Sequence, residues 1–419
     1  MFRRIAFVST IAVVLITFLY AVFNLTLSPY FAKKKSFFIN EKKLTQLTDS
    51  KYNINWIFKE HTSKEYIVGW VDNNILVLKD LDKVYLYDKR HGTTQKIASC
   101  GENEIINTLQ LNEQNVLLHY IYDEEIDIKF CKSKLKNEDY EYFFFDENHS
   151  NQNRLEIYDF QNDSSEKIFE HRCKWRLIKS MDTYVFRDFQ AVGCSNNGRF
   201  IVWCIENEIG KFDFCVYDTK TKIKKEYIFE AMNRFDRIDD IKLSNDGRSV
   251  FFAGTSASNL MTEKSLYQLD LGSDKLTCQL LISDVHTFKF SYDEKYIIYD
   301  YLENKFDQKS YRLAYLDLLT KRTIDISDEI IKGSFAVATS KNTVAFVKNN
   351  DTSAQLFVKD LRSETSKEIL IYSIDQISSA NEVFIKWINA NKSLIITYVN
   401  PSPGNQPSKL STFIVDISK

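Results

Sequence analysis

The stretch Leu243-Ser244-Asn245-Asp246-Gly247-Arg248, followed by the apolar run Val250 to Gly254, decides the fold. Asp-Gly supplies the positive φ that a tight turn needs, so the stretch predicts two antiparallel strands joined by a short corner. A second copy, Cys194-Ser195-Asn196-Asn197-Gly198-Arg199, precedes the apolar run Phe200 to Ile205. The chain therefore repeats one β-hairpin.

The repeat continues at a regular spacing along most of the 419 residues. Corner residues 195, 244, 291, 340 and 389 are 49, 47, 49 and 49 positions apart, and weaker corners at Asp72 and Asn112 bring the total to seven. A second marker follows each corner, namely an expected strand that ends in Asp: Asp88, Asp159, Asp218, Asp270, Asp317, Asp360 and Asp416. Both markers predict seven units.

Each unit reads as four antiparallel strands. The second strand is almost continuously apolar, which indicates cover on both faces, and the fourth is rich in Lys and Thr, as in Lys222 to Phe229, which protects an outer edge. The pattern predicts an all-β, seven-bladed β-propeller over residues 43–419. The last unit lacks a fourth strand, and Lys43 to Thr48 has the composition of one, so we expect an N-terminal strand to close the ring.

The Ser-x-Asp-Gly-Arg corner and the strand Ser265-Leu266-Tyr267-Gln268-Leu269-Asp270 resemble the WD-like repeats of TolB-type propellers and of prolyl oligopeptidase propeller domains. The resemblance covers residues 43–419 and implies the fold rather than an activity. Two features of those families are missing from this sequence. There is no room before residue 43 for the small α/β domain of TolB, and no Gly-x-Ser-x-Gly nucleophile elbow occurs.

A separate segment precedes the repeats. Residues 5–32 form an uncharged, apolar run, and about 20 residues are enough to span a bilayer as a helix. Large residues stand where a signal peptidase site needs small ones, so residues 1–32 are predicted to be an uncleaved transmembrane signal anchor, joined by linker 33–42 to the propeller. We expect a single-pass membrane protein with the propeller on the extracytoplasmic side. Basic residues flank the run on both sides, so the orientation is only weakly specified.

Loop length identifies one side of the ring as the candidate binding face, because binding residues are often carried on long loops held by a rigid scaffold. The longest insertion, residues 123–153, contains Tyr140, Tyr142 and Phe144, and it either contacts a partner or folds back onto the ring. Arg172, Trp175 and Arg176 are of residue types that are common at binding hot spots, but they could equally pack against a strand. The mixed charges of Arg234, Asp236 and Arg237 could surround the channel mouth or lie in a solvated loop. The last candidate is His286, a histidine near the face.

Catalytic motifs are absent from the sequence. The six histidines show no metal-ligand spacing and no glycine-rich phosphate loop occurs, so we predict no catalytic residue, metal or cofactor. A net charge of −2 gives no reason to expect nucleic acid as a partner. The odd number of cysteines, seven, leaves at least one unpaired, although Cys204 and Cys215 flank one hairpin and could meet across it.

Two functions remain open. The favoured one is a non-enzymatic, membrane-tethered scaffold that binds a protein or extracellular ligand through its long-loop face. The alternative is a propeller lyase or hydrolase that acts on a glycan or another polymer at the channel mouth. A tight constellation of titratable side chains near the channel would favour the enzyme.

Overall fold

The computed structural model describes the β-strands of this chain and many of their turns. It divides the chain into two compact units, residues 1–44 and residues 45–419. The described residues are 47–49, 54–61, 66–70, 75–79, 83–88, 90–91, 93–101, 104–112, 114–122, 140–143, 152–172, 175–178, 183–186, 189–208, 211–230, 237–255, 264–273, 276–302, 311–350, 353–362, 369–374, 382–388, 391–400 and 409–417.

Every regular element among these residues is a β-strand, and none of them belongs to a helix long and apolar enough to cross a membrane. The expected anchor, residues 1–32, and the expected linker, residues 33–42, lie outside the described residues.

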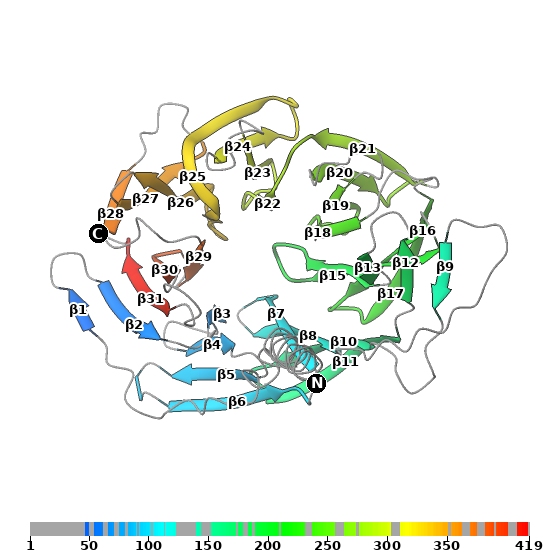
Figure 1. The fold of residues 1–419 in the computed structure, drawn as a ribbon, viewed down its shortest axis with the longest axis horizontal. Helices are drawn as coiled ribbons and strands as arrows, with labels where there is room; N and C mark the ends of the chain where they lie inside the picture. Colours follow the sequence, from blue (N-terminus) through cyan, green and yellow to red (C-terminus); the bar gives the residue numbers. More distant parts are fainter. Residues whose placement is uncertain are drawn as a thin grey trace, which may run out of the picture. The chain divides into compact units, whose positions relative to one another are not determined.

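Antiparallel sheets stand side by side around a ring in residues 45–419, which is the arrangement of a β-propeller (Figure 1). Four of these sheets have four strands each. The first holds β3 (Tyr66–Trp70), β4 (Ile75–Lys79), β5 (Lys83–Asp88) and β6 (Thr93–Ser99). The second holds β7 (Glu104–Gln110), β8 (Asn115–Tyr122), β10 (Gln152–Asp159) and β11 (Ser164–Arg172). The third holds β14 (Phe189–Cys194), β15 (Phe200–Glu208), β16 (Lys211–Asp218) and β17 (Ile223–Glu230). The fourth holds β18 (Arg237–Leu243), β19 (Ser249–Thr255), β20 (Lys264–Asp270) and β21 (Thr277–Ile282).

The remaining sheets depart from the four-stranded pattern. A seven-stranded sheet holds β22 (Thr287–Phe290), β23 (Tyr296–Leu302), β24 (Tyr311–Asp317), β25 (Thr323–Val337), β26 (Thr343–Asn350), β27 (Ser353–Asp360) and β28 (Ile369–Ile374). A five-stranded sheet has the order β1 (Leu47–Asp49), β2 (Ile54–His61), β31 (Lys409–Asp416), β30 (Ser393–Asn400) and β29 (Glu382–Ile388). A small sheet outside the ring holds β13 (Thr183–Phe186), β12 (Trp175–Ile178) and β9 (Tyr140–Phe143).

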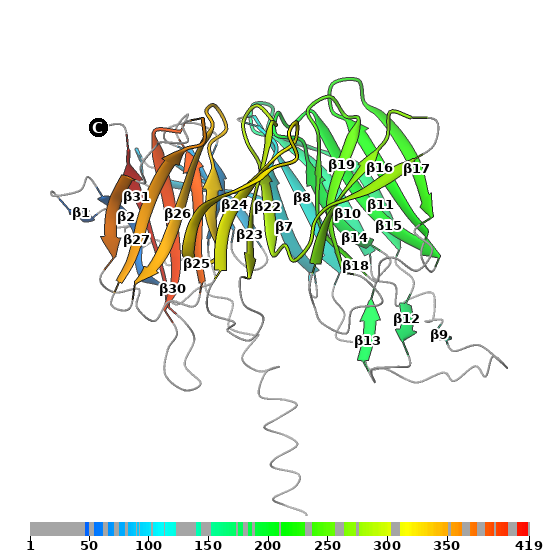
Figure 2. The same ribbon diagram turned by 90° about the horizontal axis from the view of Figure 1, so that it is seen from above.

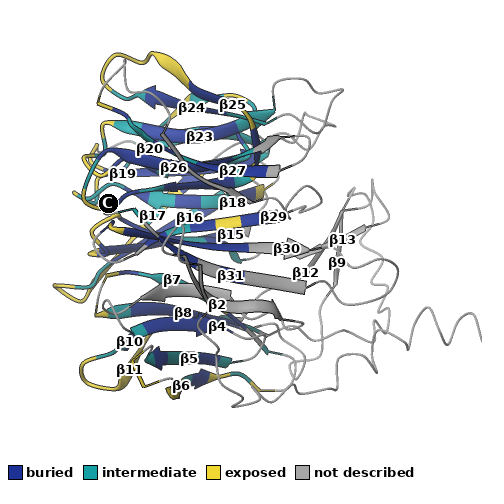
Figure 3. Ribbon diagram, turned by 90° about the vertical axis from the view of Figure 1, so that its left-hand side faces the viewer, coloured by how far each residue is buried: buried dark blue, intermediate teal, exposed yellow. Residues whose placement is uncertain are grey.

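The hydrophobic core lies between neighbouring sheets. One cluster joins Val202 and Cys204 of β15 to Phe252 of β19 and Leu269 of β20. Comparable clusters join other pairs of neighbouring sheets, so the middle strands are covered on both faces, as their apolar sequences predict. Figure 3 shows this distribution, with buried residues along the strands and exposed residues gathered at many of the turns.

The repeat markers are found where the sequence places them. Each strand expected to end in Asp does so, from β5 at Asp88 to β31 at Asp416. Gly198 and Gly247 have φ angles of 66° and 75°, which confirms the positive φ predicted for the two strongest corners. The all-β propeller fold is therefore confirmed.

Two details of the prediction need correction. Residues 43–48 were expected to pair with the last sheet, but β2, which begins at Ile54, pairs with β31, and β1 lies outside β2. The apolar residues of β2, such as Ile54, Trp56 and Ile57, suit an inner position better than the polar residues 43–48 do. Separate four-stranded sheets were also expected throughout, whereas β25 runs without a break from its pairing with β24 to its pairing with β26.

The possible cysteine pair is not formed. In the register of β15 and β16, Cys204 lies opposite Phe214, and Cys215 lies opposite Trp203. Successive residues of a strand point to opposite faces, so the two thiols lie on opposite faces of the sheet. Both are free, and Cys204 and Cys215 belong to different hydrophobic clusters.

Candidate functional site

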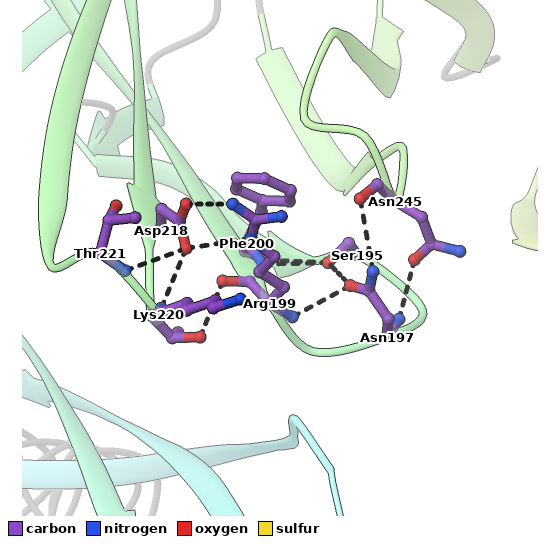
Figure 4. A network of polar contacts seen from close by, with 9 residues as sticks. Ser195, Asn197, Arg199, Phe200, Asp218, Lys220, Thr221 and Asn245 are labelled. Carbon is purple, nitrogen blue, oxygen red and sulfur yellow. Dashed lines mark hydrogen bonds and ion pairs between the residues drawn. The ribbon is translucent and has the colours of Figure 1, made fainter.

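The corner motif that defines the repeat has a structural role (Figure 4). In the corner after β14, Ser195 Oγ accepts a hydrogen bond from the backbone N–H of Phe200 at 3.0 Å and donates one to Asn197 Oδ1 at 2.7 Å. Arg199 forms an ion pair with Asp218 at the end of β16, at 2.7 Å. Ser244 and Asp246 repeat the Ser195 and Asn197 pattern in the next corner.

Neighbouring corners are also joined to one another. The backbone N–H of Asn197 donates to Asn245 Oδ1 at 2.8 Å, and the backbone N–H of Asn245 donates to Glu294 Oε2 at 2.9 Å. Farther along, Asn342 Nδ2 donates to Asp293 Oδ2 at 2.8 Å. The described corners from Asn197 to Asn342 therefore have a structural role, because their hydrogen bonds join neighbouring sheets.

In most of the repeats, the Asp that ends the third strand caps a turn. Asp218 Oδ1 accepts a hydrogen bond from the backbone N–H of Lys220 at 2.9 Å, and the Arg199 guanidinium beside it holds the pKa of this carboxyl well below its usual range. Asp159, Asp270, Asp317 and Asp360 accept equivalent backbone hydrogen bonds. These acidic residues are therefore structural, in agreement with their place in the repeat.

The two longest insertions meet in the small sheet. Strand β9, from the insertion at residues 123–153, pairs antiparallel with β12, which follows β11. In this register Tyr142 lies opposite Arg176, and Trp175 lies opposite Phe143. Figure 2 places β9, β12 and β13 below the ends of the ring strands, so the small sheet projects from one side of the ring. The structure thereby brings together Tyr140, Tyr142, Trp175 and Arg176 in one sheet, which sequence reasoning did not predict.

The other predicted site residues are more scattered. Arg172 is the last residue of β11 and lies opposite Gln152. Arg237, the exposed first residue of β18, forms an ion pair with Asp239, which also contacts Lys264 at 3.1 Å. His286 is half-buried just before β22. Phe144, Arg234 and Asp236 lie outside the described residues.

A second group of side chains gathers at the ring centre. Lys242, Lys289 and Lys386 lie on β18, β22 and β29, which Figure 1 places at the inner edge of the ring. Each lysine is half-buried between two buried apolar residues of its own strand. We call these three residues the axial lysine cluster.

The lysines of this cluster act on one another electrostatically. Burial, and then repulsion by Lys242, lowers the pKa of Lys289 to about 8, although Asp300 and Asp240 oppose the shift. Burial, and then repulsion by Lys289, lowers the pKa of Lys386 to about 8. Lys289 Nζ donates a hydrogen bond to the backbone oxygen of Phe335 and lies 4.6 Å from the centre of its ring.

The two carboxylates near the cluster, Asp300 and Asp240, differ in their hydrogen bonds. Asp300, fully buried on β23, accepts hydrogen bonds from the backbone N–H groups of Thr287 at 2.9 Å and Gly333 at 2.8 Å. It also contacts His286 Nδ1 at 3.1 Å. Asp300, on β23, therefore links this strand to β22 through Thr287 and to β25 through Gly333. Burial raises the pKa of Asp240, whose Oδ2 accepts a hydrogen bond from Thr287 Oγ1 at 3.4 Å.

The described residues hold no group of three or more His, Cys, Asp or Glu side chains that could bind a metal ion. The chemistry that the ring centre offers is instead that of ammonium groups, which attract anions and act as bases when their pKa lies near neutrality.

Sequence reasoning missed the axial lysine cluster, although a signal for it exists. Directly before three corners the sequence has a Lys between two apolar residues: Ile241-Lys242-Leu243, Phe288-Lys289-Phe290 and Ile385-Lys386-Trp387. In a strand covered on one face, that alternation points the three lysines to the same accessible side.

Comparisons with known proteins show the fold and no closer relationship. No protein-family model and no curated protein sequence matches this chain. An oligogalacturonate lyase solved in complex with manganese is 8% identical with a TM-score of 0.55, covering 90% of this chain and 97% of the lyase. TolB from Acinetobacter baumannii is 10% identical with a TM-score of 0.38 and 82% and 77% coverage. A prolyl endopeptidase is 11% identical with a TM-score of 0.45 and 82% and 49% coverage. The chain is a β-propeller whose structural neighbours include TolB and the prolyl oligopeptidase propeller domain.

Proposed function

We propose that this chain is a membrane-tethered, seven-bladed β-propeller that binds a protein or another extracellular ligand through its long-loop side, without catalysing a reaction. Seven blades follow if the seven-stranded sheet is two blades that share β25, which pairs with β24 through its first half and with β26 through its second half. The pairing of β2 with β31 supports closure of the ring by the N-terminal strand. Closure covers the edge of β31, which would otherwise be open.

The single observation that carries the binding proposal is the small sheet. Two insertions that are far apart in sequence pair through β9 and β12, and they place Tyr142 opposite Arg176 and Phe143 opposite Trp175. Tyr, Trp and Arg are the residue types enriched at the centres of protein interfaces. A sheet that only tolerated insertion would have no need of this composition.

Site-specific crosslinking tests this proposal. A photoreactive amino acid in place of Tyr142 or Arg176, introduced into the full chain in membranes, should give a discrete crosslinked product that mass spectrometry identifies. The matched control places the same probe at Ile228, an exposed apolar residue of the outer strand β17, and should give no such product. Equal crosslinking at all three positions would indicate adventitious contacts and would contradict the proposal.

The tether and the side of the membrane are part of the same proposal. Residues 5–32 are an uncharged apolar run of sufficient length to span a bilayer. Protease added to intact cells should degrade the propeller while the N-terminus stays membrane-associated. Full protection of the propeller, with degradation only after lysis, would place it on the cytoplasmic side.

A second candidate function is enzymatic, and the axial lysine cluster favours it, because a lysine with a pKa of about 8 can act as a general base. The substrate to test is oligogalacturonate, on which the structural neighbour acts, with and without added Mn²⁺. Cleavage by the wild type that is lost in Lys289→Met would support a polymer-cleaving enzyme. No cleavage under either condition would leave the binding proposal.

A further inference from the structure

We propose that the axial lysine cluster binds a small oxyanion that carries two or more carboxylate or phosphate groups. The cluster consists of Lys242, Lys289 and Lys386 at the inner edge of the ring (Figure 1). This inference does not depend on partner binding by the small sheet, because the two features lie on different strands.

The three lysines occupy equivalent places in their repeats, on strands at the inner edge of the ring. Each lysine lies in the first strand of its repeat, directly before the corner region, and buried apolar neighbours fix each strand face. Opposite them in the second strands lie the apolar residues Phe251, Ile298 and Ile395, which offer no charge. Lys289 and Lys386 each interact electrostatically with Lys242 and with one another. Three lysines from three different strands therefore share one region.

The assembly of like charges has a cost that a bound anion would offset. Burying an ammonium group among other ammonium groups destabilises its charged form, as the lowered pKa values of Lys289 and Lys386 record. The two nearby carboxylates are Asp300 and Asp240. Asp300 accepts hydrogen bonds from the backbone of Thr287 and Gly333 and contacts His286, and burial raises the pKa of Asp240, which disfavours its charged form. An oxyanion would accept charge-assisted hydrogen bonds from the lysines, which are among the strongest hydrogen bonds in proteins.

The surroundings limit the ligand to a small anion. Ammonium groups repel metal cations, and a chain with a net charge of −2 has no broad positive field for a nucleic acid. Phe384, two residues before Lys386 on β29, has 57% of its surface exposed and lies on the same face of the strand. It supplies an apolar wall beside the charged groups.

The test uses citrate as the carboxylate probe and pyrophosphate as the phosphate probe. Binding to the purified full chain is measured by calorimetry and by the shift in melting temperature, at constant ionic strength adjusted with chloride. We expect one or both probes to raise the melting temperature of the wild type. Citrate alone identifies a carboxylate ligand, pyrophosphate alone a phosphate ligand, and both together the shared oxyanion chemistry.

Three variants locate the site. Lys289→Met and Lys386→Met keep an unbranched side chain and remove the charge, and each should weaken binding about tenfold or more, since a charge-assisted hydrogen bond is lost. The control Lys224→Met removes an exposed lysine of β17 that is paired with Glu226, and it should bind like the wild type. No shift with either probe, or equal binding by all variants, would overturn the proposal.

Discussion

At the scale of single residues, the repeat motif is a set of hydrogen bonds that the local sequence encodes. Ser195 and Asn197 close the corner, Gly198 supplies its positive φ, and Arg199 ties it to Asp218 on another strand. All but the last of these contacts join residues within six positions, so a turn pattern predicts them. The bonds from one corner to the next, such as Asn197 to Asn245, follow from the ring itself.

Replacing Asp218 by Asn tests the ion pair with Arg199. Asn keeps an oxygen for the backbone N–H of Lys220 but loses the charge, so the variant should unfold at a lower urea concentration at neutral pH. The folded protein holds the pKa of Asp218 below its unfolded value of about 4, so this stabilisation is present above that pH and is lost as the pH falls through the folded pKa. The difference between the two proteins, followed by urea unfolding, should therefore narrow below about pH 4. A gap that widened on acidification would refute this role.

Gly193 is required for a reason that the sequence does not reveal. A Cβ at this position of β14 would lie 1.8 Å from the backbone oxygen of Ile241 on the neighbouring β18, and a backbone atom cannot move aside cheaply. We expect Gly193→Ala to lower the free energy of unfolding by roughly 1–3 kcal/mol, the usual cost of overpacking. Gly101→Ala is the control, because the nearest atom to its Cβ would be the Glu104 Oε2 at 3.7 Å. Urea unfolding of both variants measures the difference, and equal stability would show that the sheets can separate at this point.

At the scale of elements, the sequence predicted the strands that carry regular markers. It did not predict the elements that join two repeats or two insertions. The strands that end in Asp were found from turn chemistry alone. Strand β25 was not predicted as continuous, because a single strand that leaves one sheet unit and enters the next has no local signature other than its length of 15 residues. The pairing of β9 with β12 was missed for the same physical reason, since their contact is long-range and neither segment encodes it.

Removing β9 should leave the ring intact. Strand β10 is paired with β8 and β11, whereas β12 is the only partner of β9 among the described strands. We expect replacement of residues 123–151 by a short glycine-serine turn to change the free energy of unfolding by less than about 1 kcal/mol, because loop-closure entropy depends only weakly on loop length. Circular dichroism on heating checks stability, and limited proteolysis should show faster cleavage near β12 and β13. Loss of the folded ring would mean that the insertion supports the propeller directly.

At the scale of the whole molecule, the candidate sites differ in how far the sequence could reach them. Residues chosen by type, such as Tyr142 and Arg176, came together in the small sheet through long-range pairing. The axial lysine cluster depends on which strands face the ring centre, and that follows only once the register of every repeat is known. The apolar-Lys-apolar triplets before three corners carry this information only when read together with the propeller fold.

The last prediction concerns closure of the ring by its N-terminal strand. If β2 supplies the outer partner of β31, a chain that begins at residue 45 should fold with an unchanged melting temperature, and a chain that begins at residue 62 should not. The shorter chain would leave the edge of β31 open, and an unpaired edge strand both lowers stability and templates aggregation. Differential scanning calorimetry and light scattering of the two proteins measure these effects. Since both chains lack residues 1–44, the difference between them reports on β1 and β2 alone, and equal melting temperatures would show that the ring holds together without its N-terminal strand.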